Sequence, residues 1–213
     1  VNEWSQADLM YELNCDGKST KYCRDDITNG YLSNLTSGTT YWFNGDNNSK
    51  NGTYNYNNNI RSLSIDKVAK VRWNLGGYNT SSASALNMYN AERGTLHISN
   101  PSDGITRNNI WDGKIALIYP SDYGYASTDQ ACRSGLGSNN CKNENWLFNR
   151  TYQWTLSPRS GNAFYVFYVS SGGFVGSRSA DGTNGVRPVL FLKSDVVIAG
   201  GTGESIENAY TLE

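Results

Sequence analysis

The stretch FYVFYVSSGGFVGSR, residues 164–178, constrains the fold of this chain more than any other segment. Two runs of aromatic and β-branched residues flank Ser-Ser-Gly-Gly, and this arrangement predicts an antiparallel β-hairpin. The surrounding region 154–192 begins with WTLSP and ends with VRPVLFL, which both resemble core strands. The segments RSGNAFY and GSRSADGTN between them have no period that would bury them. We therefore expect a rigid frame that displays polar and aromatic side chains.

The rest of the chain predicts helices first and a compact antiparallel sheet later, which is an α+β arrangement. In the first helix, Ser5 is the expected N-cap, and Trp4 and Leu9 are expected to pair around it. We expect further helices over 64–77 and 84–94, and strands over 115–119, around Trp146 and Trp154, over 185–193 and near the C-terminus. The prediction is one domain, 1–213, with an Asn-rich insertion at 41–59 that forms a long surface loop or an irregular hairpin.

The composition favours loops and excludes some partners. The chain has 27 Asn, 22 Gly and 15 Tyr, a mixture that suits turns and binding loops more than helix interiors. A net charge of -1 gives no electrostatic reason to expect nucleic acid or an anionic membrane as a partner. No apolar run is long enough for a membrane helix, and no secretory signal is visible. Because the sequence starts at Val1 rather than Met, we expect a processed or truncated product, and any anchoring segment would lie upstream.

Four cysteines stand in two polar stretches, NCDGKSTKYC and ACRSGLGSNNC. We expect the local disulfides Cys15–Cys23 and Cys132–Cys141, because each would close a short loop. A metal site would need closer cysteine spacing or nearby histidines, and His97 is the only histidine. Disulfides indicate an oxidising, extracytoplasmic location.

The order of motifs in the second half resembles a known fold. NWL at 145–147, WTLSP at 154–158, the hairpin with Gly172-Gly173 and GVRPVLFLK at 185–193 resemble the bacterial C-type-lectin-like fold. Formylglycine-generating enzymes, the major paralogous domains of gut bacteria, and variable proteins of diversity-generating retroelements share that fold. GKIALIYPSDYGYA and the closing KSDVVIAGG are similar to surface proteins of gut Firmicutes, some of which carry a pilin-like N-terminal helix. The resemblance covers about 111–213; before that it rests on WSQADLMYELN and WNLGG.

The resemblance implies an extracellular or cell-surface module that binds a protein or glycan on another cell or host surface. The group includes retroelement-diversified proteins, so it also implies a display region that is open to diversification. The chain lacks the Glu-Pro-Asn and Trp-Asn-Asp motifs of calcium-dependent lectins, so calcium-dependent sugar binding is not expected. Because the chain has one histidine and no metal-ligand spacing, we expect no metal and no cofactor. Nucleic acid and membrane insertion by this segment are not expected.

Two alternatives stay open. One is a structural pilin-like surface subunit. The other is an enzyme on the formylglycine-generating fold, which would need reactive thiols in a pocket. The sequence does not favour an enzyme, because a Ser-His-Asp set is not credible around His97 alone. Asp122, Asp129 and Glu144 also lack a diagnostic spacing.

The expected ligand contacts lie on the hairpin and its flanks, because Tyr offers contact area at low entropic cost on a rigid scaffold. They are Arg159, Asn162, Tyr165, Phe167, Tyr168, Ser170, Phe174, Ser177, Arg178, Ser179, Asp181 and Asn184. A regular pleat with Val166 facing the core would place Tyr165, Phe167 and Val169 outward. A bulge at the turn would reverse that register, so both tyrosines stay in the set.

Each choice has a plainer alternative. The aromatic residues 165–168 would also suit a core strand. Arg178 and Asp181 would also suit an unimportant surface pair, and Arg187 is expected to be structural. Trp73, Trp111, Trp146 and Trp154 are expected in the core.

Overall fold

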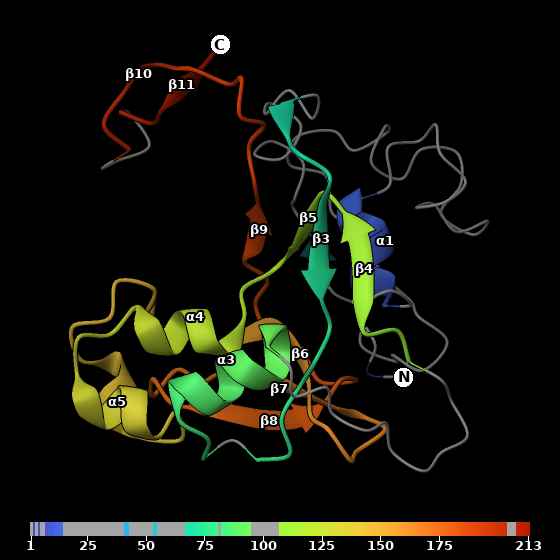
Figure 1. Cartoon of the computed structure of the whole chain (residues 1–213), viewed down its shortest axis with the longest axis vertical. Coiled ribbons are helices and arrows are strands. Elements are labelled where there is room, and N and C mark those ends of the chain that lie inside the picture. The colour runs from blue at the N-terminus through green and yellow to red at the C-terminus, as the bar shows by residue number, and fades with distance from the viewer. Residues whose placement is uncertain are drawn as a thin grey trace.

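The computed structural model describes residues 2, 4, 7–14, 41–42, 53–54, 67–80, 82–94, 107–203 and 208–213. Short helices and small antiparallel sheets make up this part of the chain, which confirms the α+β prediction (Figure 1). Among the described helices, none has both the length and the hydropathy to cross a membrane.

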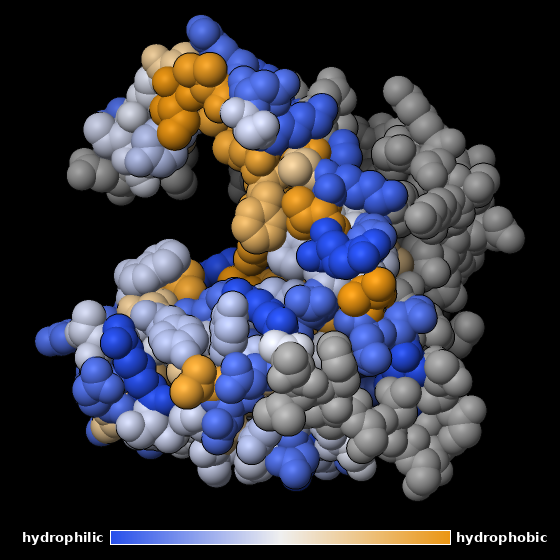
Figure 2. All heavy atoms as spheres, viewed as in Figure 1, coloured by the Kyte–Doolittle hydropathy of each residue, from blue (hydrophilic) through white to orange (hydrophobic). Residues whose placement is uncertain are grey.

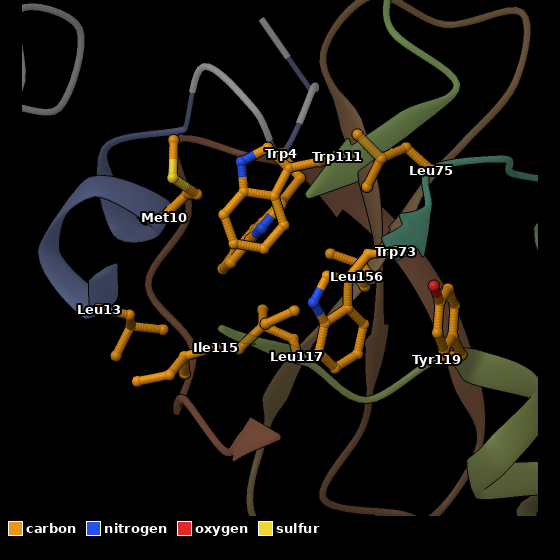
Figure 3. Close-up of a cluster of buried hydrophobic side chains, with 11 residues drawn as sticks. Trp4, Met10, Leu13, Trp73, Leu75, Trp111, Ile115, Leu117, Tyr119 and Leu156 are labelled. Atoms are coloured by element: carbon orange, nitrogen blue, oxygen red, sulfur yellow. The ribbon is translucent and has the colours of Figure 1, made fainter. Parts of the chain in front are cut away.

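In one layer of the molecule, the N-terminal helix packs against short strands. Its elements are α1 (Asp8–Asn14), β3 (Val71–Asn74), β4 (Ile110–Gly113), β5 (Ile115–Leu117) and β9 (Pro188–Leu190). β3 pairs with β4 and β5 pairs with β9, both antiparallel. Figure 3 shows the aromatic core between them, where the ring centroids of Trp4 and Trp111 lie 6.1 Å apart. The predicted first helix is confirmed, but it begins at Asp8; Ser5 lies outside the described residues.

The predicted helix over 64–77 is wrong, because residues 71–74 form strand β3. Trp73 pairs with Trp111, and its Nε1 donates a hydrogen bond to the carbonyl oxygen of Gly113 at 3.1 Å. Gly76 and Gly77, at the end of that segment, do not end a helix. Because they lack a side chain, the backbone of neighbouring segments can lie close to them. A Cβ at Gly76 would meet the carbonyl oxygen of Ala91 at 2.0 Å. Long-range pairing therefore overrides the local helical pattern.

A second layer consists of a three-stranded sheet covered on one face by helices (Figure 1). Its elements are α3 (Ala85–Arg93), α4 (Pro120–Tyr125), α5 (Gln130–Ser134), the short 3-10 helix η3 (Asn139–Lys142), β6 (Gln153–Pro158), β7 (Tyr165–Val169) and β8 (Val175–Ser179). The strands lie in the order β6–β7–β8, and β7–β8 is the predicted hairpin.

Local signals define α3 well. The Ser84 side chain accepts a hydrogen bond from the Asn87 backbone nitrogen, and Gly94 follows the last turn, as predicted. Pro120, which directly follows the predicted strand 115–119, occupies the first turn of α4.

The predicted Cys132–Cys141 disulfide is confirmed, and it joins α5 to η3. Both cysteines are fully buried in the same apolar cluster as Phe167 and Val169 of the hairpin. The bond therefore stabilises the layer beneath the sheet rather than an exposed loop. Cys15 and Cys23 lie outside the described residues.

The tryptophan predictions are confirmed only in part. Trp73 and Trp111 are buried, and Trp154 is half-buried. Trp146 is 80% exposed, so its core assignment is wrong. Its neighbour Asn145 takes the inward position and donates hydrogen bonds to the carbonyl oxygens of Tyr123 and Cys141, each at 2.9 Å.

The C-terminal segment forms a separate ribbon and does not close the main sheet. In this ribbon β10 (Ile198–Gly200) pairs with β11 (Thr211–Leu212). Residues 191–193 leave the sheet because Leu192 pairs with Val68 and the Lys193 nitrogen donates to the Lys67 carbonyl. The ribbon projects from the body, and Figure 2 shows a recess between the two.

The remaining strands are short. The predicted core strand over 185–193 is reduced to β9, which is only half-buried. In the Asn-rich insertion, β1 (Tyr41–Trp42) pairs antiparallel with β2 (Thr53–Tyr54), as the hairpin alternative predicts.

Candidate ligand-binding face of the hairpin sheet

The sheet β6–β7–β8 has an inner face on the helices and an outer face turned away from them. Phe167, Val169 and Val175 are fully buried on the inner face. Tyr168 and Arg178 alternate with them and lie half-buried on the outer face. Of the two registers that the sequence left open, the one with Phe167 and Val169 outward is wrong, because both side chains face the core. The prediction of Phe167 as a ligand contact is wrong for the same reason. The helices settle the register, because they cover the side that holds Phe167.

Tyr168 lies at the centre of an aromatic group on the outer face. Its ring centroid is 5.9 Å from that of Tyr152, 6.5 Å from Trp154 and 6.3 Å from Phe174. The contacts with Trp154 and Phe174 are edge-on, an arrangement that favours aromatic pairs beyond simple burial. Tyr152 is 46% exposed, so part of this aromatic area is available to a ligand.

Arg178 adds a positive charge beside these rings. Its guanidinium carbon lies 5.9 Å from the centroid of the Tyr168 ring, within cation–π range. Its Nη1 donates to Asn184 Oδ1 at 3.2 Å. The Asn184 amide nitrogen is buried and has no hydrogen-bond partner in the described part of the chain. We call this group the outer-face cluster: Tyr152, Trp154, Tyr168, Phe174, Arg178 and Asn184.

A glycine lets the central ring lie flat on the sheet. Gly176 is the cross-strand partner of Tyr168. A Cβ at Gly176 would lie 2.8 Å from Cζ of Tyr168, closer than such contacts occur. The ring therefore covers the bare backbone at this position, which fixes its orientation.

Three other predicted contact residues meet on the opposite side of the sheet. Arg159 Nη1 donates to Ser177 Oγ at 3.3 Å, and its guanidinium carbon lies 5.8 Å from the Tyr165 ring centroid. Arg159 Nε also donates to the Asn79 carbonyl at 3.1 Å. These contacts connect β8 to the loop after β3. Arg159, Tyr165 and Ser177 therefore do not join the outer-face cluster.

The other predicted residues support the backbone or stand apart. Asn162 Oδ1 accepts from the backbone nitrogens of Phe164 and Tyr165, both at 2.8 Å. Ser170 is fully buried, and its hydroxyl accepts from the Gly172 nitrogen at 3.0 Å. Ser179 is half-buried at the end of β8, and Asp181 is exposed in the following turn.

Arg187, which was predicted to be structural, lies behind the site. Its Nη1 donates to the Leu147 carbonyl at 2.7 Å, and burial lowers the pKa of its guanidinium. This hydrogen bond connects the start of β9 to the loop after η3. A guanidinium group suits this role because it carries several N–H donors.

A buried carboxyl group lies under the sheet. Glu92 of α3 is 2% exposed and accepts hydrogen bonds from Ser121 Oγ and, at 3.2 Å, from Ser157 Oγ of β6. Burial raises the pKa of Glu92 to about 8. Next to it, Arg93 pairs with Asp122 and lies 4.0 Å from the Tyr119 ring centroid. Glu92 is thus a polar part of the core rather than a solvent-facing acid.

Sequence reasoning missed Tyr152, Trp154 and Glu92. The alternation in YQWTLS was a usable signal for the first two, since Tyr152 and Trp154 share one face of a strand. Nothing local marked Glu92, because its partners come from distant segments.

The described residues contain no group of three or more His, Cys, Asp or Glu side chains that would hold a metal ion. His97 lies outside the described residues. The arrangement on the outer face offers ring stacking and one cation beside the rings. Such groups suit non-covalent recognition.

Comparison with known proteins adds no assignment: no protein-family model, no curated protein and no solved structure matches the chain.

Proposed function

We propose that this chain is an extracellular or cell-surface ligand-binding module, and that the outer-face cluster is its contact surface. One observation carries the proposal: three aromatic rings surround Tyr168, and Arg178 lies beside the Tyr168 ring, on the face of the sheet opposite the helix-covered core. Aromatic residues and Arg dominate the energetics of protein binding sites. The partner is a protein or glycan on another cell or host surface.

We also propose that the chain has the C-type-lectin-like fold. The order of β6, the β7–β8 hairpin and β9 agrees with the motif order that resembles bacterial C-type-lectin-like domains. On that basis the region 154–192 is the display region of a single domain over 1–213, open to retroelement diversification. The buried Cys132–Cys141 disulfide supports the oxidising location.

The proposal assigns no catalysis to the chain. A formylglycine-type enzyme would need reactive, accessible thiols. Cys132 and Cys141 are bonded to each other and fully buried, so this pair does not supply them.

The test measures binding and folding in the same variants. Labelled protein is applied to a glycan array and to a panel of purified extracellular matrix proteins. Tyr168→Ala and Arg178→Ala should each weaken binding to any positive probe by about tenfold or more. Both variants should remain folded at the temperature of the binding assay, which their melting curves check. Tyr210→Ala and Arg72→Ala are matched controls, because Tyr210 is exposed on the C-terminal ribbon and Arg72 is exposed on β3. Equal binding by all four variants would contradict the proposal.

A structural surface subunit is the second candidate. The observation that favours it is the C-terminal ribbon, on which Val197, Ile198 and Tyr210 are exposed. Sedimentation velocity over a range of concentrations tests it: self-association that Val197→Asp abolishes would favour the subunit.

A further inference from the structure

An open pocket of about 690 Å³ lies at the turn of the hairpin. Its lining residues come from the end of η3, from the loop that follows it and from the β7–β8 turn: Lys142, Asn143, Glu144, Asn145, Phe148, Arg150, Ser171 and Gly172. The pocket adjoins the outer-face cluster, since a Cβ at Gly172 would lie 3.8 Å from the Phe174 ring. Arg150 also lies two residues before Tyr152.

The lining has a positive charge balance. Lys142 and Arg150 give +2 and Glu144 gives -1, for a net +1. No described residue forms an ion pair or hydrogen bond with the side chain of Lys142 or Arg150. The carboxylate of Glu144 does not pair with either cation; it accepts a hydrogen bond from the Thr128 hydroxyl. Both cations are thus available to an anion, and the guanidinium fork of Arg150 matches an oxyanion.

The walls of this pocket are held in place from several sides. Cys141, beside Lys142, is fixed by the buried disulfide. The turn rests directly on η3: Gly173 has φ +94, and a Cβ there would lie 2.8 Å from the Lys142 nitrogen. The Tyr123 hydroxyl is within hydrogen-bonding distance of the carbonyl oxygens of Cys141 and Gly173, at 3.1 and 2.8 Å. The two walls therefore form one unit.

The loop itself adopts a costly backbone at two lining residues. Glu144 has φ 45 and Arg150 has φ 63, a left-handed region that such side chains seldom occupy. Around Arg150, Asn149 Oδ1 accepts from the Thr151 nitrogen at 3.2 Å and from the Gln153 amide. Strain of this kind persists where the surroundings enforce it, and it concentrates at ligand sites.

We propose that this pocket binds the carboxylate or sulfate of an acidic saccharide whose neutral rings lie on the outer-face cluster. The inference rests on the proposed function, because it assigns the chemical class of ligand at that surface. A saccharide fits better than a peptide, since Phe148 is the only apolar side chain among the eight lining residues. Peptide ligands obtain most of their affinity from apolar anchors in closed pockets.

Charge-neutralising variants test the pocket. The probes are oligosaccharides that end in a sialic or uronic acid, the same compounds with the carboxylate reduced to an alcohol, sulfated oligosaccharides, and acidic peptides. Lys142→Gln with Arg150→Gln should weaken binding of an acidic saccharide by about tenfold or more. Reduction of the carboxylate should have a similar effect. Raising the salt concentration should weaken binding of the acidic probe but not of the neutral one. The carboxylate and sulfate probes distinguish the two sources of the anion.

Lys70→Gln is the matched control, because Lys70 is an exposed lysine far from the pocket in the sequence. Arg150→Lys keeps the charge but removes the fork of donors, so its affinity should lie between those of the parent chain and Arg150→Gln, which separates the contribution of charge from that of the fork.

The outcomes separate the inference from the proposed function. If Tyr168→Ala abolishes binding while the reduced saccharides bind as well as the acidic ones, the inference fails and the proposed function stands. Unchanged binding by the double Gln variant, or tighter binding of acidic peptides than of acidic saccharides, also overturns the inference. If Tyr168→Ala and Arg178→Ala leave binding intact while the double Gln variant loses it, the pocket stands and the outer-face cluster fails.

Discussion

The two faces of the β6–β7–β8 sheet use neighbouring residues for different purposes. On the inner face, Phe167 and Val169 are fully buried against the helices. On the outer face, Tyr168 contacts three other aromatic rings and remains half-buried. Two adjacent residues of one strand therefore have different roles: Phe167 belongs to the core, and Tyr168 is a candidate ligand contact. The comparison teaches that stability and binding can be altered separately in this sheet, one strand position apart.

The strongest test of the comparison is Phe167→Ala. Removal of this fully buried ring should lower the free energy of unfolding by about 3–5 kcal/mol. Chemical denaturation gives the value. Phe167→Leu, which refills part of the volume, should cost much less. A small effect of Phe167→Ala would show that the inner face is not the core of this layer.

Loss of the Cys132–Cys141 disulfide should have the next largest effect. The bond closes a loop with a sequence separation of 9, so Cys132→Ala with Cys141→Ala should cost roughly 2–3 kcal/mol in the chain-entropy model. Thermal unfolding with and without reductant measures this cost. With reductant present, the parent chain should approach the double variant. Any change that reductant causes in the double variant would report the predicted Cys15–Cys23 bond.

Glu92 makes the stability of the inner side depend on pH. Its pKa is about 8 in the folded chain against 4.5 for the free group, so the folded state retains a proton that the unfolded state releases. The stabilisation is therefore complete below about pH 4.5 and is lost as the pH rises to about 8. Within that window the free energy of unfolding should fall by about 1 kcal/mol per pH unit.

Denaturation of the parent chain and of Glu92→Gln across this range provides the measurement. The Gln variant should lose most of the slope, because it cannot ionise. A slope that is equal in both proteins would assign the pH dependence to other groups.

The outer face should give the smallest change in stability. Arg178→Ala should lower the free energy of unfolding by less than about 1 kcal/mol, as is usual for surface positions. Tyr168→Ala should cost about 1–2 kcal/mol, because its half-buried ring loses its contacts with three other rings. Both variants should therefore cost less than Phe167→Ala, one residue away from Tyr168. If Tyr168→Ala proves as costly as Phe167→Ala, both faces are core and the display interpretation is wrong.

The parts of the fold that follow from local signals were predictable. Ser84 and Gly94 delimit α3, and Ser-Ser-Gly-Gly defines the β7–β8 turn. Strand β3 was not predictable in this way, because its conformation depends on pairing Trp73 with Trp111. Local propensity also favoured Trp146 for the core, whereas the amide of Asn145 took the inward position.

The candidate site was predictable as a region but not as a surface. The sequence indicated the hairpin, yet the side that faces outward depends on where the helices pack, and that information lies outside the strand. Of the predicted contacts, Tyr168, Phe174, Arg178 and Asn184 come together, while Phe167 lies in the core. The turn pocket combines a loop and a turn that no single motif marked.

The close fit of Tyr168 on Gly176 has a consequence for how related chains would diverge. The Cβ of a side chain at position 176 would lie 2.8 Å from the Tyr168 ring, so that ring would have to move. A relative that keeps an aromatic residue at 168 in this orientation is therefore expected to keep glycine at 176. A relative with a small residue at 168 is free to carry a side chain opposite it. Variation on this face should therefore appear as correlated exchanges between cross-strand partners.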